Sequence, residues 1–155
     1  MNPLTEAQLR AELRGDEGEV LKVYDDATGK PIGPGTVVRG NPTAGVGRNL
    51  SGRGFTLAES EYLLGNDIAA CESELAPTMP WITTLTPGRQ TAIYSLYFNI
   101  GLGNPARFEA KWPKFLAQMQ AGQFAAAADN LETSQPWASE VGPRAKRLGE
   151  LVRYG

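Results

Sequence analysis

The spacing of apolar residues changes at Thr56, and this change limits the folds open to the chain. Between residues 20 and 50, short runs such as VLKVY, TVVR and PTAGVGRNL are separated by turns rich in glycine and proline. Such runs are typical of short antiparallel strands. From FTLAESEYLL onwards, apolar residues recur at helical intervals. A small sheet followed by helices predicts an α+β fold.

Local signals predict where the helices begin and end. Thr56 and Glu59 form a capping box at the start of a long helix, and Thr86 followed by Pro87 opens another that stops at Gly101. This second helix is apolar on nearly all sides and should be central. Three shorter helices are expected in WPKFLAQMQAG, QFAAAADNLE and VGPRAKRLGELVRY.

The chain has 155 residues and a mass of 16.7 kDa, which suits a single domain. We expect a sheet lobe over about 15–56, a connecting helix over 57–76, and a helical lobe made of 77–155 with 1–14. No signal-peptide pattern and no apolar stretch of membrane-spanning length is found. The sequence therefore predicts a cytoplasmic, soluble monomer without a membrane anchor.

Residue types exclude several kinds of catalytic site. The sequence has no histidine, and Cys71 is its one cysteine. Most zinc hydrolases need His or Cys ligands, and Ser or Cys triads need a His base. No metal and no cofactor is therefore expected, and carboxylate chemistry remains. The net charge of −2 and the lack of a strong basic patch argue against a nucleic-acid partner.

The stretch GDEGEVLKVYDDATG holds the candidate carboxylates. A helix capped by Thr5 should carry Leu9, Leu13 and Glu17 at intervals of four, with Gly18 as the residue that ends it. This spacing places Glu17 on the apolar side of the helix, where desolvation favours a protonated acid, whereas Asp26 begins a polar turn. The residues alone leave open a second interpretation, a solvated hairpin with charges at its ends.

Four motifs in order resemble the tailed-phage lysozymes, the endolysin muramidases of glycoside hydrolase family 24. The resemblance covers about residues 9 to 154. The motifs are DEG followed by YDD with Asp26 nine positions after Glu17, TAGVGRNL from Thr43, AIYSLYFNIG ending at Gly101, and Trp137 with PRAKR. The resemblance implies a lysozyme-like fold, with a small N-terminal antiparallel sheet lobe joined by a long helix to an all-helical C-terminal lobe.

The resemblance also implies a reaction, the inverting hydrolysis of the β-1,4 bond between N-acetylmuramic acid and N-acetylglucosamine in bacterial peptidoglycan. Glu17 would be the general acid, Asp26 would activate or orient the attacking water, and Thr43 would hold that water. The remaining matches are supporting or substrate-binding positions: Asn99, Trp137, and Arg144, which corresponds to an arginine that pairs with the catalytic glutamate.

The chain departs from the family pattern in three places. Asp25 adjoins Asp26, and only the Tyr-x-Asp spacing favours Asp26 as the second carboxylate. The loop over 29–41 is about ten residues longer than in the best-known members, which puts Thr43 in doubt. Arg48 stands where several relatives have histidine, and we predict that it forms an ion pair with Asp67.

The biological expectation follows from the same resemblance. Such an enzyme acts on peptidoglycan glycan strands, waits in the host cytoplasm, and reaches the cell wall in the periplasm when a holin opens the membrane, which lyses the host at the end of a phage lytic cycle. Two alternatives remain from the sequence. One is a lytic transglycosylase, and the other is a lysozyme-fold protein that binds the wall without cutting it.

Overall fold

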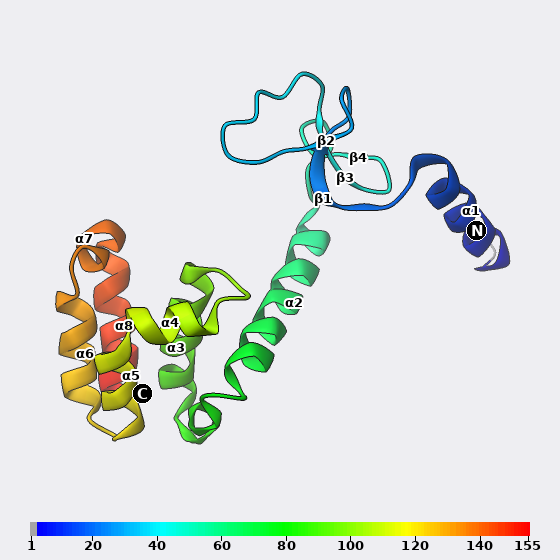
Figure 1. Cartoon of the computed structure of the whole chain (residues 1–155). Helices are drawn as coiled ribbons and strands as arrows, with labels where there is room; N and C mark the ends of the chain where they lie inside the picture. Colours follow the sequence, from blue (N-terminus) through cyan, green and yellow to red (C-terminus); the bar gives the residue numbers. More distant parts are fainter. Residues whose placement is uncertain (1–2) are drawn as a thin grey trace. The chain divides into compact units, whose positions relative to one another are not determined.

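The computed structural model describes residues 3–155, apart from the side chain of residue 4 (Figure 1). The chain forms two compact units, Met1–Ser60 and Glu61–Gly155. The first unit contains α1 (Pro3–Glu17), β1 (Val20–Asp25), β2 (Lys30–Pro31), β3 (Pro42–Gly45) and β4 (Arg48–Asn49). The helix α2 (Leu57–Leu75) spans the boundary between the units. The second unit continues with the 3₁₀ helix η1 (Pro80–Thr84), α3 (Pro87–Ile100), α4 (Pro105–Lys111), α5 (Pro113–Gln120), α6 (Phe124–Thr133), α7 (Trp137–Val141) and α8 (Pro143–Tyr154).

The four strands form one antiparallel sheet in the order β2-β1-β3-β4. Tyr24 lies opposite Pro31 on one side of β1 and opposite Thr43 on the other. With helices following this small sheet, the architecture is α+β and lysozyme-like, as the sequence predicts. The division into lobes given above stays a prediction.

The predicted strand in TVVR, residues 36–39, is wrong. These residues lie in the loop between β2 and β3 and pair with no strand. The backbone N–H groups of Arg39 and Gly40 donate to the carboxylate of Asp25, at 2.8 and 2.9 Å. The Asp25 side chain of β1 thus accepts the N–H groups that backbone pairing with another strand would require.

The first helix begins earlier than predicted. It starts at Pro3, so Thr5 lies inside the helix and is not its N-cap. Proline suits the first turn because its φ is already helical and its missing N–H is not needed there. The end of the helix is confirmed, because Gly18 follows with φ +72° and its N–H donates to the carbonyl of Arg14 at 3.1 Å.

The leucine face predicted for this helix is not buried. Leu9 and Leu13 are 40% and 43% exposed, and Glu17 is exposed as well. Other large apolar side chains of the first unit are exposed as well, among them Leu21 at 85% and Val37 at 83%. The side chains that are buried in the described part of the first unit are those of Asp25 and Thr43, both polar. Hydrogen bonds rather than an apolar core therefore organise the sheet unit.

The later helices follow their sequence signals closely. The capping box at α2 is confirmed, since the Thr56 N–H donates to Glu59 Oε2 at 2.8 Å and the Glu59 N–H donates to Thr56 Oγ1 at 3.3 Å. Thr86 and Pro87 open α3, and Gly101 follows its last residue. The two short helices α4 and α7 were not predicted, because at seven and five residues they are too short to show a helical repeat of apolar residues.

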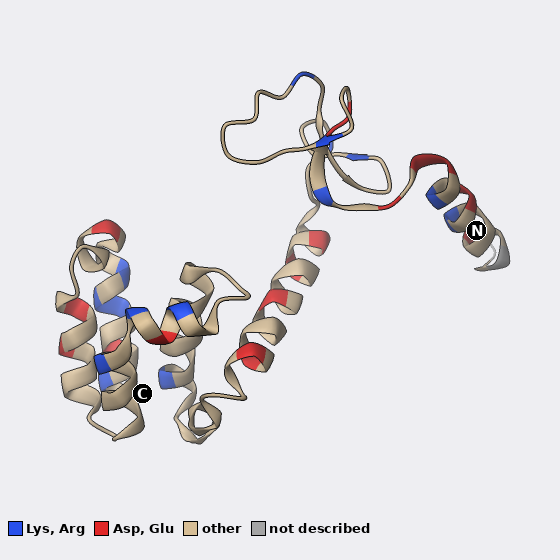
Figure 2. Cartoon of the chain, viewed as in Figure 1, with Lys and Arg blue, Asp and Glu red and all other residues tan. Residues whose placement is uncertain are grey.

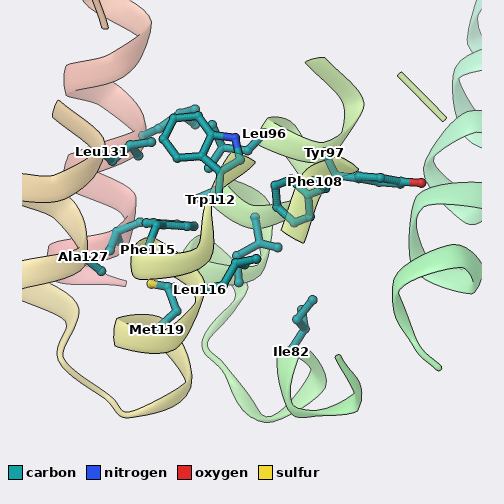
Figure 3. Packing of buried hydrophobic residues seen from close by; sticks show 14 of the residues in the cluster. Ile82, Leu96, Tyr97, Phe108, Trp112, Phe115, Leu116, Met119, Ala127 and Leu131 are labelled. Atoms are coloured by element: carbon teal, nitrogen blue, oxygen red, sulfur yellow. The ribbon is translucent and has the colours of Figure 1, made fainter. Parts of the chain in front are cut away.

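The apolar core lies in the second unit, and its members are numbered from 71 upwards among the described residues. The helix α3 supplies its centre, with Ile93, Leu96 and Tyr97 almost completely buried. Figure 3 shows the rings of Tyr97 and Phe108 side by side, and their centroids are 5.4 Å apart. Deletion of such a buried ring costs about 3–5 kcal/mol, so this unit holds most of the stabilising burial.

The hydroxyl of Tyr97 lies at the edge of the apolar cluster and contacts α2. Its hydroxyl donates to a carboxylate oxygen of Glu74, which also accepts the Gly103 N–H at 2.7 Å. Burial and then this hydrogen bond raise the pKa of Tyr97 to about 12. The hydroxyl also accepts the Asn104 N–H at 3.2 Å, so the contact with Glu74 supplies the acceptor that its own proton needs.

Charged groups are unevenly distributed over the helices (Figure 2). The helix α2 carries acidic residues and no Lys or Arg, whereas α8 carries four basic residues and one acidic residue. Within residues 3–155, no helix combines the length and the apolar character needed to cross a bilayer.

Candidate active site

Glu17 is the last residue of α1, and its carboxylate lies against the turn between β3 and β4. A methyl group built on Gly47 would come within 2.8 Å of Glu17 Oε2, so a residue with a Cβ would push the carboxylate out of this position. Gly47 also has φ +62°, a backbone conformation that glycine adopts without strain. The backbone of the TAGVG stretch thus packs closely against another group, and that group is Glu17.

Asp26 directly follows β1 and is exposed to solvent. One carboxylate oxygen accepts the backbone N–H of Asn41 at 2.6 Å, and the other accepts Asn41 Nδ2 at 3.1 Å. These bonds, the backbone bond foremost, lower the pKa of Asp26 below its ordinary value. The carboxylate is therefore ionised at neutral pH, as a group that orients or deprotonates water must be.

Asp25 has a different environment, although it is the next residue. Its carboxylate is buried and accepts three backbone N–H groups, from Arg39, Gly40 and Ala27. The Arg39 bond is the strongest influence lowering the pKa of Asp25. Because the carboxylate is already used to close the long loop, the geometry favours Asp26 over Asp25 as the second working carboxylate.

Thr43 lies on the neighbouring strand β3 and is 3% exposed. Thr43 lies opposite Tyr24 in the sheet. Two residues further along β1, the Asp26 N–H donates to the Asn41 carbonyl at 3.1 Å, so Asp26 lies opposite Asn41 in the same register. Opposite residues share a face and side chains alternate along a strand, so Asp26 and Thr43 are diagonal neighbours on one face. Such neighbours lie roughly 7–8 Å apart, which leaves room for a water molecule. The long loop thus does not displace Thr43 from Asp26.

Asn41 is the residue of this arrangement that the sequence reasoning missed. It donates twice to Asp26, and its carbonyl accepts both the Asp26 N–H and the Thr43 hydroxyl, the latter at 3.2 Å. The sequence feature that could have pointed to Asn41 is its position two residues before Thr43, at the end of the loop that follows Asp26. Asn41 couples the orientation of the two side chains.

Three further predicted residues lie in the second unit, near the C-terminal half of α3. Trp137 is buried at the start of α7, and its Nε1–H donates to Asn99 Oδ1 at 3.3 Å. Arg144, in the first turn of α8, donates to the Ser95 carbonyl and hydroxyl at 2.9 and 3.0 Å. Ser95 and Asn99 are one helical turn apart, so α3 holds both groups on one face.

The predicted ion pair between Arg48 and Asp67 is wrong. Arg48 pairs instead with Glu59, at 2.5 Å for the Nη1–Oε1 contact, and also donates to the carbonyl of Gly54. Glu59 lies in the first turn of α2, and Asp67 lies about 12 Å further along the same helix. The capping-box acid is therefore the partner within reach of β4, and the pair lowers the pKa of Glu59 to about 2.

Comparison with known proteins identifies the family. The phage lysozyme family matches residues 14–153. The pre-baseplate central spike protein Gp5 of Enterobacteria phage T4 is 28% identical over 160 residues. That match covers 92% of this chain but 27% of the T4 protein, so the chain spans about a quarter of its relative's length. The extent of the family match leads to one conclusion. The chain belongs to the phage lysozyme family.

Proposed function

We propose that this chain hydrolyses the β-1,4 bond between N-acetylmuramic acid and N-acetylglucosamine in bacterial peptidoglycan, with inversion at the anomeric carbon. Glu17 protonates the glycosidic oxygen as general acid. Asp26 orients or deprotonates the attacking water, and Thr43 holds that water from the neighbouring strand. Membership of the phage lysozyme family supports glycosidase activity on the cell wall in general.

One observation carries the assignment of roles, namely the unlike settings of Glu17 and Asp26. Asp26 is kept ionised by two hydrogen bonds from Asn41 and shares a sheet face with Thr43. Glu17 receives no such pair of donors among the described residues and lies over the backbone of Gly47. Glycoside hydrolysis needs one carboxyl group that gives a proton and one that stays charged.

Asn99, Trp137 and Arg144 are proposed as supporting or substrate-binding residues. Trp137 and Asn99 are linked by a hydrogen bond, and Arg144 is held by Ser95, so each side chain has a defined orientation. Trp137 is 3% exposed, so its role would be to orient Asn99, whereas the oriented guanidinium of Arg144 could hold a charged group of the substrate. No cofactor takes part in the proposed reaction.

The biological role we propose is that of an endolysin. The enzyme would act as a monomer on glycan strands in the periplasm, after a holin has given it passage from the host cytoplasm, and would lyse the host. The chemistry of the site is directed at a carbohydrate, and no nucleic acid or membrane anchor is part of this proposal.

The decisive assay follows the turbidity of permeabilised Gram-negative cells. The wild type should clear the suspension, whereas Glu17→Gln and Asp26→Asn should each be at least about a hundredfold slower, the usual contribution of general acid–base groups. Asp25→Asn is the matched control for Asp26→Asn, since it changes the neighbouring carboxylate. Wild-type rates for Glu17→Gln would overturn the proposed mechanism.

Analysis of the products separates this function from its alternatives. A hydrolase leaves a reducing sugar at the new end, with inverted configuration at the moment of cleavage. A lytic transglycosylase leaves a 1,6-anhydro sugar. A lysozyme-fold protein that only binds the wall would sediment with peptidoglycan sacculi and release neither product.

The similarity to the T4 central spike protein favours a second candidate role for the same chemistry. The chain would then act as part of a phage particle rather than as a free enzyme. An antibody against the chain would distinguish the roles. Detection in purified virions would support the particle-bound role, and detection only in the soluble fraction of late-infected cells would support the endolysin.

A further inference from the structure

The long loop between β2 and β3 ends on two neighbouring carboxylates. The backbone N–H groups of Arg39 and Gly40 donate to Asp25 at 2.8 and 2.9 Å. The next N–H group, that of Asn41, donates to Asp26 at 2.6 Å. Bonds from N–H groups to ionised carboxylates are stronger than bonds between neutral groups. The last residues of the loop are therefore fastened to the acid that we propose as the base.

The loop backbone also packs tightly against Asp26. A methyl group built on Gly40 would overlap Asp26 Oδ1 and would lie 2.7 Å from Ala27 Cβ and 2.8 Å from the Ala27 nitrogen. A side chain at position 40 would thus push the loop away from the carboxylate. The glycine lets the Asn41 N–H approach Asp26 closely, so the position of Asn41 relative to Asp26 is well defined.

Asn41 binds both oxygens of the Asp26 carboxylate. Its backbone N–H donates to Oδ1 and its side-chain Nδ2 donates to Oδ2, at 2.6 and 3.1 Å. One donor on each oxygen fixes the rotation of the carboxylate about its Cβ–Cγ bond. An ionised carboxylate has about four acceptor positions, so each oxygen keeps a lone pair for a further donor. The carboxylate is thus held in one orientation and can still accept a proton of the attacking water.

The same residue determines how Thr43 meets that water. Thr43 Oγ1 donates to the Asn41 carbonyl at 3.2 Å. This bond uses the one proton of the hydroxyl and leaves its lone pairs free, so Thr43 faces the water as an acceptor. Asp26 in its ionised form is an acceptor as well. A water bound between them donates one proton to each, and its own lone pairs remain free to attack the anomeric carbon.

We propose that Asn41 is the positioning residue of the attacking water, and that the end of the enlarged loop serves to hold it in place. This inference rests on the proposed function. As the water oxygen bonds to the anomeric carbon, the proton directed at Asp26 passes to that carboxylate. The glycosidic bond breaks, and its oxygen leaves with the proton of Glu17. Asn41 acts through Asp26 and Thr43 and exchanges no proton itself.

The pH dependence of the reaction should report on Asn41. The pKa of Asp26 is lowered by the backbone bond from Asn41 and next by the side-chain bond, whereas burial and the negative charge of Asp25 act to raise it. Two cations lie nearby in the sequence, Lys30 and Arg39, and within residues 3–155 neither forms an ion pair with Asp26. The base must be ionised, so a higher pKa of Asp26 moves the acidic limb of kcat/KM to higher pH.

The test measures kcat and KM from pH 3 to pH 9 on soluble, un-crosslinked glycan strands. Asn41→Ala keeps the backbone bond and removes Nδ2, so the acidic limb should move up by about 0.5–1 unit. At neutral pH, kcat should fall about tenfold because Asp26 is free to rotate, with KM within about twofold. Asn41→Asp places a carboxylate beside Asp26 and should move the limb further in the same direction. The alkaline limb, which belongs to Glu17, should stay in place.

Thr36→Ala is the matched control. It removes a hydroxyl that accepts the Gly33 N–H at 3.0 Å within the same loop. This variant should keep the wild-type pH profile and kcat, whatever its Tm. An unshifted acidic limb in Asn41→Ala, or an equal shift in Thr36→Ala, would overturn the inference. If Asp26→Asn is inactive in the same series, the proposed function survives that outcome. Wild-type rates for Asp26→Asn would instead refute the proposed role of Asp26 itself.

Discussion

Replacing Gly47 by alanine would test whether the backbone at this position holds the Glu17 carboxylate in place, in addition to stabilising the turn. The substitution has two costs. Gly47 has φ +62°, and a residue with a Cβ loses roughly 1–2 kcal/mol in this left-handed region. For a chain of this length, that loss lowers Tm by about 2–8 °C. The second cost is steric, because the new methyl group would lie 2.8 Å from Glu17 Oε2.

The steric cost falls on catalysis. Ordinary contact begins at 3.4 Å, so the Glu17 carboxylate must move by about 0.6 Å or the turn must open. Misplacement of a reacting group by roughly 1 Å can cost about a hundredfold in rate. We therefore expect Gly47→Ala to lower kcat by about ten- to a hundredfold at temperatures where the protein remains folded.

Gly45→Ala provides the matched comparison. Gly45 has φ +66° in the same turn, but a methyl group there would have no neighbour within 4 Å. Both variants should show the same drop in Tm by thermal unfolding, and only Gly47→Ala should lose kcat in the peptidoglycan assay by more than a few-fold. Equal kcat values for the two variants would refute the idea that the Gly47 backbone positions Glu17.

Three further predictions concern ionisable groups outside this turn. Asp25→Asn should lower Tm more than Asp26→Asn does, because it turns an NH2 group towards buried backbone N–H donors, whereas Asp26→Asn should lose activity with little change in Tm. The pKa of Glu59 falls from 4.5 to about 2 on folding, so its pairing with Arg48 stabilises the protein fully above pH 4.5 and is lost as the pH falls towards 2. The Tm difference between wild type and Arg48→Met, measured from pH 6 to pH 2, should shrink over that window, and a constant difference would contradict the assignment. The pKa of Tyr97 rises from 10 to about 12, so its contribution is present below pH 10 and is lost as the pH rises through 12, and an ultraviolet titration should show one tyrosine ionising late.

The sequence predicted those elements whose boundaries depend on local chemistry. The Thr56–Glu59 box, the proline after Thr86 and the glycine after Glu17 each determine a helix end through contacts within a few residues. The candidate carboxylates were likewise found from their spacing in the chain, since a helix end and a strand end lie close together in sequence.

What the sequence could not supply were contacts between distant residues. TVVR has the composition of a strand, but Asp25 is fourteen residues from Arg39 and captures its N–H. The helix that follows Arg48 carries five acidic residues, and only the geometry of the turn before α2 makes Glu59 the partner of Arg48. The role of Asn41 was hidden for the same reason, because its importance comes from pairing with Asp26 across a long loop.

The way in which the loop between β2 and β3 is fastened has an evolutionary consequence. Within this loop, the carboxylates of Asp25 and Asp26 accept backbone N–H groups from Arg39 to Asn41, just before β3. The part of the loop between β2 and Arg39 is bound to neither carboxylate. The entropy of closing a loop grows slowly, by about 0.6 kcal/mol for each doubling of length. Insertions and deletions in this segment therefore cost little and do not move Asp26 against Thr43. The size of this loop can therefore change over generations while Asp26 and Thr43 keep their relative position.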